Sequence, residues 1–151
     1  LGMLLGEEVI RVMSNIADMS SDVRIWGTQE VITLPGRKRT NTGREGEPGT
    51  YEDGPPVDIR LGLLGIGNIA LTTINAEIYN LFAQHLKKAS PLTNTVMVTI
   101  SNGRTNSGYI ITDADYGKNT FQALGNKLKP GYAEDAIVNG LVKLINQYEI
   151  K

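Results

Sequence analysis

Glu77 is the residue whose type and setting in this sequence most strongly suggest chemistry. It lies in a largely apolar stretch, residues 61–88, where the other charged side chains are Lys87 and Lys88. The pattern predicts a buried strand that runs directly into an amphipathic helix, with Asn75 as the helix cap. A carboxylate at that joint either stabilises the helix N-terminus, by about 0.3–1 kcal/mol, or ligates a metal or acts as a base. The local sequence leaves both interpretations open.

Tyr109 and His85 are further side chains of interest. Tyr109 follows a polar, glycine-containing stretch, residues 101–108. A tyrosine in such a place is typically a half-buried anchor whose hydroxyl is hydrogen-bonded. His85 is the single histidine of the chain, and there is no cysteine. These counts exclude a Cys-His catalytic pair and a zinc site built on thiolates, and a lone histidine does not make a zinc site by itself.

The elements that must position these residues follow from hydrophobic periodicity and turn signals. We expect helices over residues 4–15, 76–89, 120–128 and 133–148, strands over 22–34, 57–66, 69–74 and 94–101, an extended piece over 107–112 and a turn over 113–116. Gly67-Asn68 is a plausible two-residue hairpin turn. This order predicts an α/β or α+β fold, a layered domain with helices packed on a mixed sheet.

Residues 37–56 are predicted to form a long exposed loop, because they are rich in charge, glycine and proline and carry almost nothing apolar. A loop of that length in a compact domain is unusual and often binds a ligand or a partner. Its basic side chains suit a carboxylate or phosphate, although the interleaved acidic residues argue against a strong anion site. These side chains are Arg37, Lys38, Arg39 and Arg44.

Composition narrows the class of protein. The 151 residues suit a single domain, and the net charge of −1 with a pI near 5.9 gives no reason to expect nucleic acid or an anionic membrane as a partner. No apolar run reaches the roughly 20 residues that span a bilayer. The first residue is Leu1 rather than methionine, which suggests a processed product or an excised portion of a longer chain.

Several short motifs together resemble the neutral/alkaline non-lysosomal ceramidase family. The resemblance covers about residues 35–144, and the order and spacing of the motifs carry it. The motifs are Pro35-Gly36-Arg37, Asn75-Ala76-Glu77-Ile78-Tyr79, Ser101-Asn102-Gly103, Gly108-Tyr109-Ile110-Ile111-Thr112-Asp113 and Lys129-Pro130-Gly131-Tyr132-Ala133-Glu134-Asp135-Ala136.

The resemblance implies that the mixed sheet is the C-terminal part of a larger layered catalytic domain, and that this part holds half of a zinc site. Enzymes of that family hydrolyse the C–N amide bond of a sphingolipid with one zinc held by two histidines, a glutamate and a tyrosine. Glu77 matches the glutamate and Tyr109 the tyrosine, whereas His85 matches neither histidine. The two histidines are therefore expected from an N-terminal portion of the same protein or from a companion chain, with this chain inactive alone and an apolar docking surface beside Glu77. By resemblance only, the location is secreted or periplasmic.

Two departures from the family keep other interpretations open. The tyrosine that helps to stabilise the oxyanion in ceramidases falls at Tyr116 or at Phe121, and the better alignment places Phe121 there. The immunoglobulin-like domain that follows in ceramidases is expected to be missing, because the sequence stops just after the last predicted helix. The alternatives are a non-catalytic structural or interaction module that keeps the fold, and a self-contained hydrolase with Glu77 as base and Tyr116 as catalytic acid.

Overall fold

Two sheets, one large and one small, organise the computed structural model, which describes residues 1–17, 19–104 and 106–149. The strands are Ile25–Arg39 (β1), Tyr51–Ile66 (β2), Ile69–Ile74 (β3), Glu77–Ile78 (β4), Asn94–Val98 (β5) and Tyr109–Ile110 (β6). The large sheet has the order β1-β2-β3-β5, with β3 and β5 parallel and the other pairs antiparallel. The small sheet pairs β4 with β6 in parallel.

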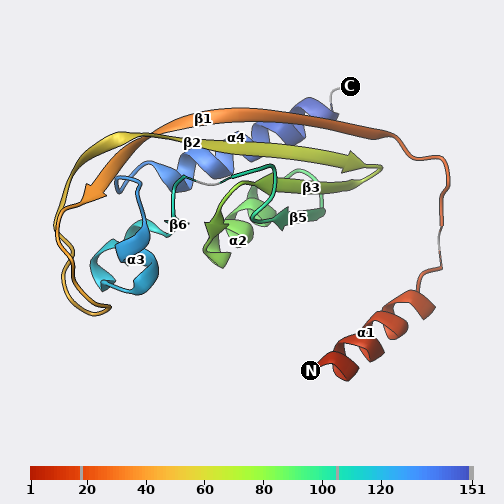
Figure 1. The fold of residues 1–151 in the computed structure, drawn as a ribbon. Helices are drawn as coiled ribbons and strands as arrows, with labels where there is room; N and C mark the ends of the chain where they lie inside the picture. The colour runs from red at the N-terminus through yellow and green to blue at the C-terminus, as the bar shows by residue number, and fades with distance from the viewer. Residues whose placement is uncertain (18, 105, 150–151) are drawn as a thin grey trace.

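Helices cover one face of the large sheet (Figure 1). The helical elements are Gly2–Ser14 (α1), Asn80–Ala89 (α2), Phe121–Gly125 (α3), Ala133–Glu149 (α4) and the 3-10 helix Asp113–Lys118 (η1). α4 packs on β1 and β2, while α2 packs on α4 and β5. The fold class predicted from the sequence, a mixed sheet with helices packed on it, is confirmed. Among the described helices, none has the length and apolarity needed to cross a membrane.

The alternation of side chains between the two faces of β2 explains why α4 packs on this strand. Every second residue of the strand points to the helix-covered face, and Ile59 and Leu61 are fully buried there. Gly140 of α4 allows the close approach, because a Cβ at this position would lie 2.6 Å from the Leu61 Cδ1 atom. At the other end of α4, the Tyr148 ring stacks on Trp26 of β1 with 5.5 Å between ring centroids. These contacts make the main core.

The expected exposed loop over residues 37–56 is wrong in its extent. β1 continues to Arg39 and β2 begins at Tyr51, so that residues 40–50 alone connect the two strands. The ladder pairs Arg39 with Tyr51 directly, and Figure 1 shows β1 and β2 as a long curved ribbon. Backbone pairing between the two strands therefore compensates for the small amount of apolar surface that these residues bury.

Prolines are tolerated in this ribbon for local reasons. The register shifts between Leu34 and Gly36, where Pro35 of β1 faces two residues of β2, Pro55 and Pro56, in a β-bulge. Pro55 and Pro56 lie in the part of β2 that pairs with β1 alone, since pairing with β3 begins only at Leu61. Both prolines lie in the bulge and have no Cα partner in β1, so their missing N–H groups cost no ladder bond.

A buried arginine fixes the far end of the ribbon. The Arg37 guanidinium lies 3.7 Å from the centroid of the Tyr51 ring and 4.6 Å from that of Tyr116. It also donates hydrogen bonds to the carbonyl oxygens of Ala123 (2.8 Å) and Asn126 (3.2 Å). Burial lowers the pKa of Arg37, and the nearby tyrosines oppose that shift. Two aromatic faces and two carbonyls thus replace the water that the cation loses.

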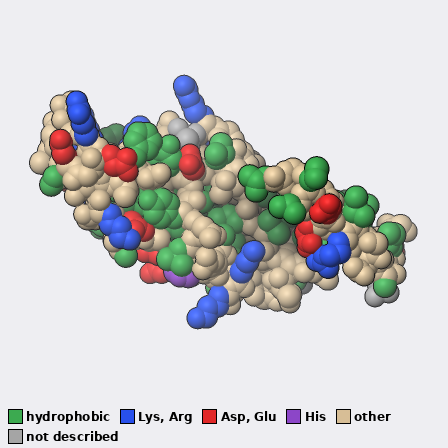
Figure 2. Space-filling view, turned by 90° about the horizontal axis from the view of Figure 1, so that it is seen from below, with side chains coloured by type: hydrophobic (Ala, Val, Ile, Leu, Met, Phe, Trp, Pro, Cys, Tyr) green, Lys and Arg blue, Asp and Glu red, His purple; other side chains and the backbone are tan. Residues whose placement is uncertain are grey.

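The first helix contrasts with the rest of the fold. α1 confirms the predicted N-terminal helix, yet it has no buried residue. It is joined to β1 by residues 15–24 and lies apart from the sheet in Figure 1. Figure 2 shows hydrophobic side chains exposed at the end of the molecule where α1 lies.

Candidate functional site

Glu77 does not cap a helix. The predicted helix start at residue 76 is wrong, because α2 begins at Asn80 with Tyr79 as its N-cap and has no acidic residue in its first turn. The side chain of Asn75, the expected cap, is used elsewhere: its Oδ1 accepts from Arg60 N (2.7 Å) and its Nδ2 donates to Arg104 O (3.0 Å). Glu77 is therefore a strand residue, and the helix-dipole explanation of its position does not apply.

The small sheet brings Glu77 and Tyr109 together. They are Cα partners in the parallel register of β4 and β6, although 32 positions separate them in the sequence (109 − 77 = 32). Paired residues of neighbouring strands project to the same face of the sheet, and the strands lie about 4.8 Å apart. The two side chains predicted as metal ligands are thus neighbours on one surface.

The oxygens of this pair are unengaged within the described part of the chain. The Glu77 side chain is exposed, and neither its carboxylate nor the Tyr109 hydroxyl has a hydrogen bond or ion pair with any described residue. The Tyr109 ring packs edge-on against Phe121, 5.6 Å between centroids. Tyr109 is therefore half-buried by its ring, as the sequence predicts, without the expected hydroxyl bond.

Two asparagines hold the backbone around the pair. Asn126 is almost fully buried, and its Nδ2 donates to the Tyr109 carbonyl (2.7 Å) while its Oδ1 accepts from Leu128 N (2.8 Å). Asn75 ties the end of β3, next to Glu77, to β2. Sequence reasoning missed both positioning roles. Asparagine beside a turn was the available signal, but the signal does not say which backbone groups the side chain meets.

The loop before Tyr109 has unusual backbone geometry. Ile100 has φ = 53°, Asn102 64° and Gly103 106°, all in the left-handed region. That conformation is costly for a β-branched residue, and such outliers cluster at functional sites. Gly108 has φ = 67°, and a Cβ there would lie 2.1 Å from the Gly125 carbonyl oxygen. Glycine is required at this position because the loop passes directly against α3.

Apolar surface is exposed on both sides of the pair. Ile100 donates its N–H to the Ala76 carbonyl, next to Glu77, and exposes 68% of its surface. Phe121, against the Tyr109 ring, exposes 59%. Both side chains leave apolar surface exposed near the pair, while the docking of another portion at this place stays a prediction.

Tyr116 lies in a different environment from that pair. Its hydroxyl donates to the Lys129 carbonyl (3.2 Å) and its ring faces Arg37. Burial raises the pKa of Tyr116 to about 12, and the charge on Arg37 partly opposes that rise. The hydroxyl is consequently neutral at ordinary pH and is already used to hold η1 to the segment before α4.

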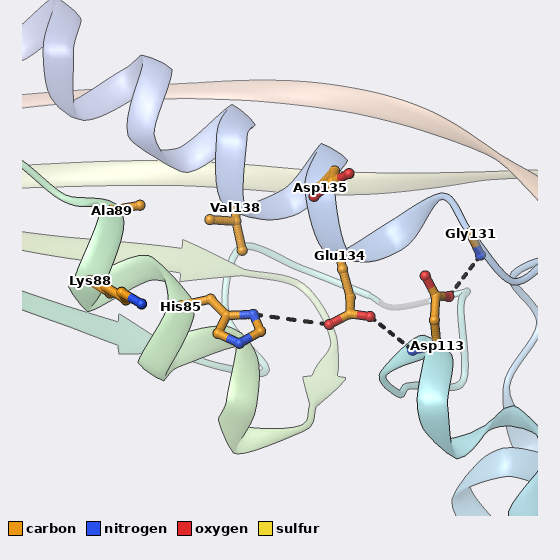
Figure 3. Close-up of a pocket in the computed structure, with 8 residues that line it drawn as sticks. All are labelled: His85, Lys88, Ala89, Asp113, Gly131, Glu134, Asp135 and Val138. Carbon is orange, nitrogen blue, oxygen red and sulfur yellow. Dashed lines mark hydrogen bonds and ion pairs between the residues drawn. The ribbon is translucent and has the colours of Figure 1, made fainter.

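A hollow between α2, η1 and α4 contains the single histidine (Figure 3). Its volume is about 580 Å³, and His85 Nδ1 lies 4.0 Å from Glu134 Oε1. Glu134 Oε2 accepts from Asp113 N (2.9 Å), and Asp113 Oδ1 accepts from Gly131 N (2.7 Å). The two carboxylates therefore satisfy one backbone donor at the start of η1 and one just before α4. We interpret this hollow as a structural joint.

A complete metal site is not present within the described residues. No group of three or more His, Cys, Asp or Glu side chains among residues 1–17, 19–104 and 106–149 is placed to hold a metal ion. A catalytic zinc takes three protein ligands and keeps one position open. Glu77 and Tyr109 supply two oxygen donors, so the fit to zinc is partial and needs further ligands.

Comparison of this chain with protein-family profiles, with curated proteins and with solved structures finds no match.

Proposed function

We propose that this chain forms part of a zinc-dependent hydrolase of N-acyl amides, to which it contributes Glu77 and Tyr109 as metal ligands. The observation that carries the proposal is the register of the small sheet, which places these two residues side by side with unengaged oxygens. The remaining ligands, two histidines by resemblance to the ceramidases, come from an N-terminal portion of the same protein or from a companion chain.

On this proposal, each residue of the candidate site has a defined role. Glu77 and Tyr109 hold the metal from one side, Asn126 fixes the backbone of Tyr109, and Asn75 fixes the strand that leads to Glu77. Zinc, when bound, lowers the pKa of a coordinated water toward about 7 and polarises a carbonyl group. Tyr116, the candidate catalytic acid or oxyanion donor, positions the segment before α4 through the Lys129 carbonyl.

Zinc content tests the ligand assignment. Native mass spectrometry, with elemental analysis, is applied to the longer polypeptide or assembly that contains this chain. We expect one zinc for each copy, and at least a tenfold loss of zinc affinity in Glu77→Gln and in Tyr109→Phe. Glu52→Gln and Tyr132→Phe are matched controls, since both side chains are exposed on other elements. Full zinc occupancy in both ligand variants would reject the assignment.

Hydrolysis of an N-acyl amide that carries a fluorescent acyl chain tests the reaction. We expect activity from the zinc-loaded assembly and none from the isolated 151-residue chain, because on our proposal the described residues supply only Glu77 and Tyr109 as ligands. Activity of the isolated chain in the presence of a chelator would instead favour the self-contained hydrolase with Glu77 as base.

A non-catalytic interaction module is the second candidate function. The observation in its favour is the uncovered apolar face of the large sheet, which is suited to binding another protein. A binding module predicts that Glu77→Gln and Tyr109→Phe change neither the zinc content nor the hydrolysis by the assembly, whereas a substitution on that sheet face does disrupt the assembly.

A further inference from the structure

The face of the large sheet opposite α4 carries a continuous apolar surface, here called the open patch. Ladder register and alternation place its members on one face. Leu64 pairs with Leu71, and Leu71 pairs with Val96, which makes an unbroken apolar row across three strands. The open patch consists of Ile25, Leu64, Ile69, Leu71, Val96 and Val98.

The strands are built to be covered on both faces. Leu63 and Leu64 are consecutive, so one of them necessarily lies on each face, and residues 96–98 are apolar without interruption. Such runs are typical of strands buried on both sides, as those of parallel pairs usually are. Ile25 nevertheless exposes 67% of its surface and Val96 44%. An exposed apolar surface of this kind marks an interface.

The same chain carries a second apolar surface without a partner. In α1, Leu5, Val9 and Met13 follow one another at intervals of four residues and form a stripe, while Glu7 and Arg11 lie on the opposite side. All side chains of α1 are exposed. A helix of 13 residues is only marginally stable in water without tertiary packing, so this stripe requires a surface to cover it.

The connection between the helix and the sheet ends at the open patch. Gly67 N donates to the Arg24 carbonyl (2.9 Å), and the Arg24 side chain donates to the Tyr148 carbonyl. These bonds fix the chain beside the β2–β3 turn, next to Ile25, the first member of the patch. From that point Figure 1 shows the chain leading beyond the end of the sheet, with α1 apart from it.

We propose that two copies of this chain form a dimer in which each α1 packs across the open patch of the other copy. The dimensions agree: α1 is about 20 Å long, and the outer strands of the four-stranded sheet lie about 14 Å apart. In a dimer with two-fold symmetry, the contact between α1 and the open patch occurs twice. That doubling brings the buried area toward the roughly 1,600 Å² of a stable interface, which one helix alone does not reach. The proposal does not depend on the zinc site.

Sedimentation velocity of the purified 151-residue chain tests the dimer. We expect a species of about twice its 16.4 kDa. Val96→Lys in the patch and Val9→Glu in α1 should each raise the dimer dissociation constant at least about tenfold, because each buries a charge at the contact. Gln29→Lys, on the same sheet face outside the patch, and Ser14→Glu in α1 should leave it unchanged. Circular dichroism verifies that all variants fold.

Mixing the two weakened variants distinguishes exchange between copies from closure of α1 onto its own sheet. The experiment uses a concentration at which Val96→Lys and Val9→Glu chains are each monomeric. A dimer that contains one of each has one unaltered helix–patch contact and one with opposite charges. The mixture should therefore dimerise. A monomeric native chain, dimers unaffected by either substitution, or a mixture that stays monomeric would overturn the proposal.

Discussion

The large and the small sheet of this protein are held in different ways. The large sheet is built from strands of five to sixteen residues whose apolar alternation is buried under α4. The small sheet joins two strands of two residues each, and side chains from elsewhere, such as Asn126, fix its position. The large sheet is therefore stabilised by the burial of apolar side chains, whereas the candidate site is positioned by specific hydrogen bonds and backbone geometry.

Leu61→Ala should give the largest effect, because it removes a fully buried side chain beneath Gly140 of α4. We expect a loss of about 2–5 kcal/mol in the free energy of unfolding, measured by urea denaturation. Val31→Ala, at a half-exposed position on the other face of the same sheet, should cost less than about 1 kcal/mol. Equal losses would mean that the two faces are equally packed.

Gly108→Ala probes the support of the small sheet. The φ of 67° and the approach to the Gly125 carbonyl are both unfavourable for alanine, so we expect a loss of roughly 1–3 kcal/mol in the free energy of unfolding. Gly117→Ala is the control, since a Cβ there meets nothing within 4 Å. A neutral Gly108→Ala would show that the loop can move away from α3 without cost.

Tyr116 links the ribbon to the body and should give stability a pH dependence. Burial raises its pKa to about 12, above the value of about 10 in the unfolded chain. The neutral hydroxyl therefore stabilises the fold fully below pH 10, and this contribution, on the order of 1–2 kcal/mol, is lost as pH rises from 10 to 12. Between pH 10 and 12, the free energy of unfolding measured by denaturation should fall less steeply for Tyr116→Phe than for the native chain. The same slope for both proteins would contradict the burial of this hydroxyl.

Glu77→Gln should have the smallest effect on folding, within about 0.5 kcal/mol, since its carboxylate makes no hydrogen bond or ion pair with a described residue. The thermal midpoint of the purified chain measures this change. A loss above 1 kcal/mol would show that Glu77 serves the fold, and the contrast between the two sheets would then disappear.

The local sequence pattern was sufficient for β3, for the turn before it and for α4, but not for residues 35–39 and 51–56, which extend β1 and β2 beyond the predicted strands. Residues 69–74 were predicted as a strand and form β3 with the same bounds, and the two-residue turn at Gly67 joins it to β2 as expected. Residues 133–148 form α4, which extends one residue further. In these segments the apolar period, the turn residues and the tertiary packing all favour the same structure.

At the candidate site, pairing with residues far along the chain determines the structure, and the local sequence pattern predicted it wrongly. Residues 75–79 have a good helix cap and apolar spacing, yet β6, more than thirty residues later, pairs with Glu77 and Ile78 and keeps them extended. Asn75 likewise serves Arg60 and Arg104 instead of a helix. The position of Arg37 against two tyrosine rings also depends on distant contacts. The sequence alone does not indicate which residues Arg37 meets.

The brevity of the β4–β6 pairing has a consequence for the order in which the protein folds and opens. β2 and β3 are joined by a two-residue turn and can form early, while β4 meets β6 only after a loop of about thirty residues has closed, for two residue pairs in return. The backbone amides around Glu77 and Tyr109 should then exchange with solvent far sooner than those under α4. The candidate site therefore occupies the less protected of the two sheets, so that slowed amide exchange at β4 and β6 would be a sensitive sign of a ligand or partner bound there.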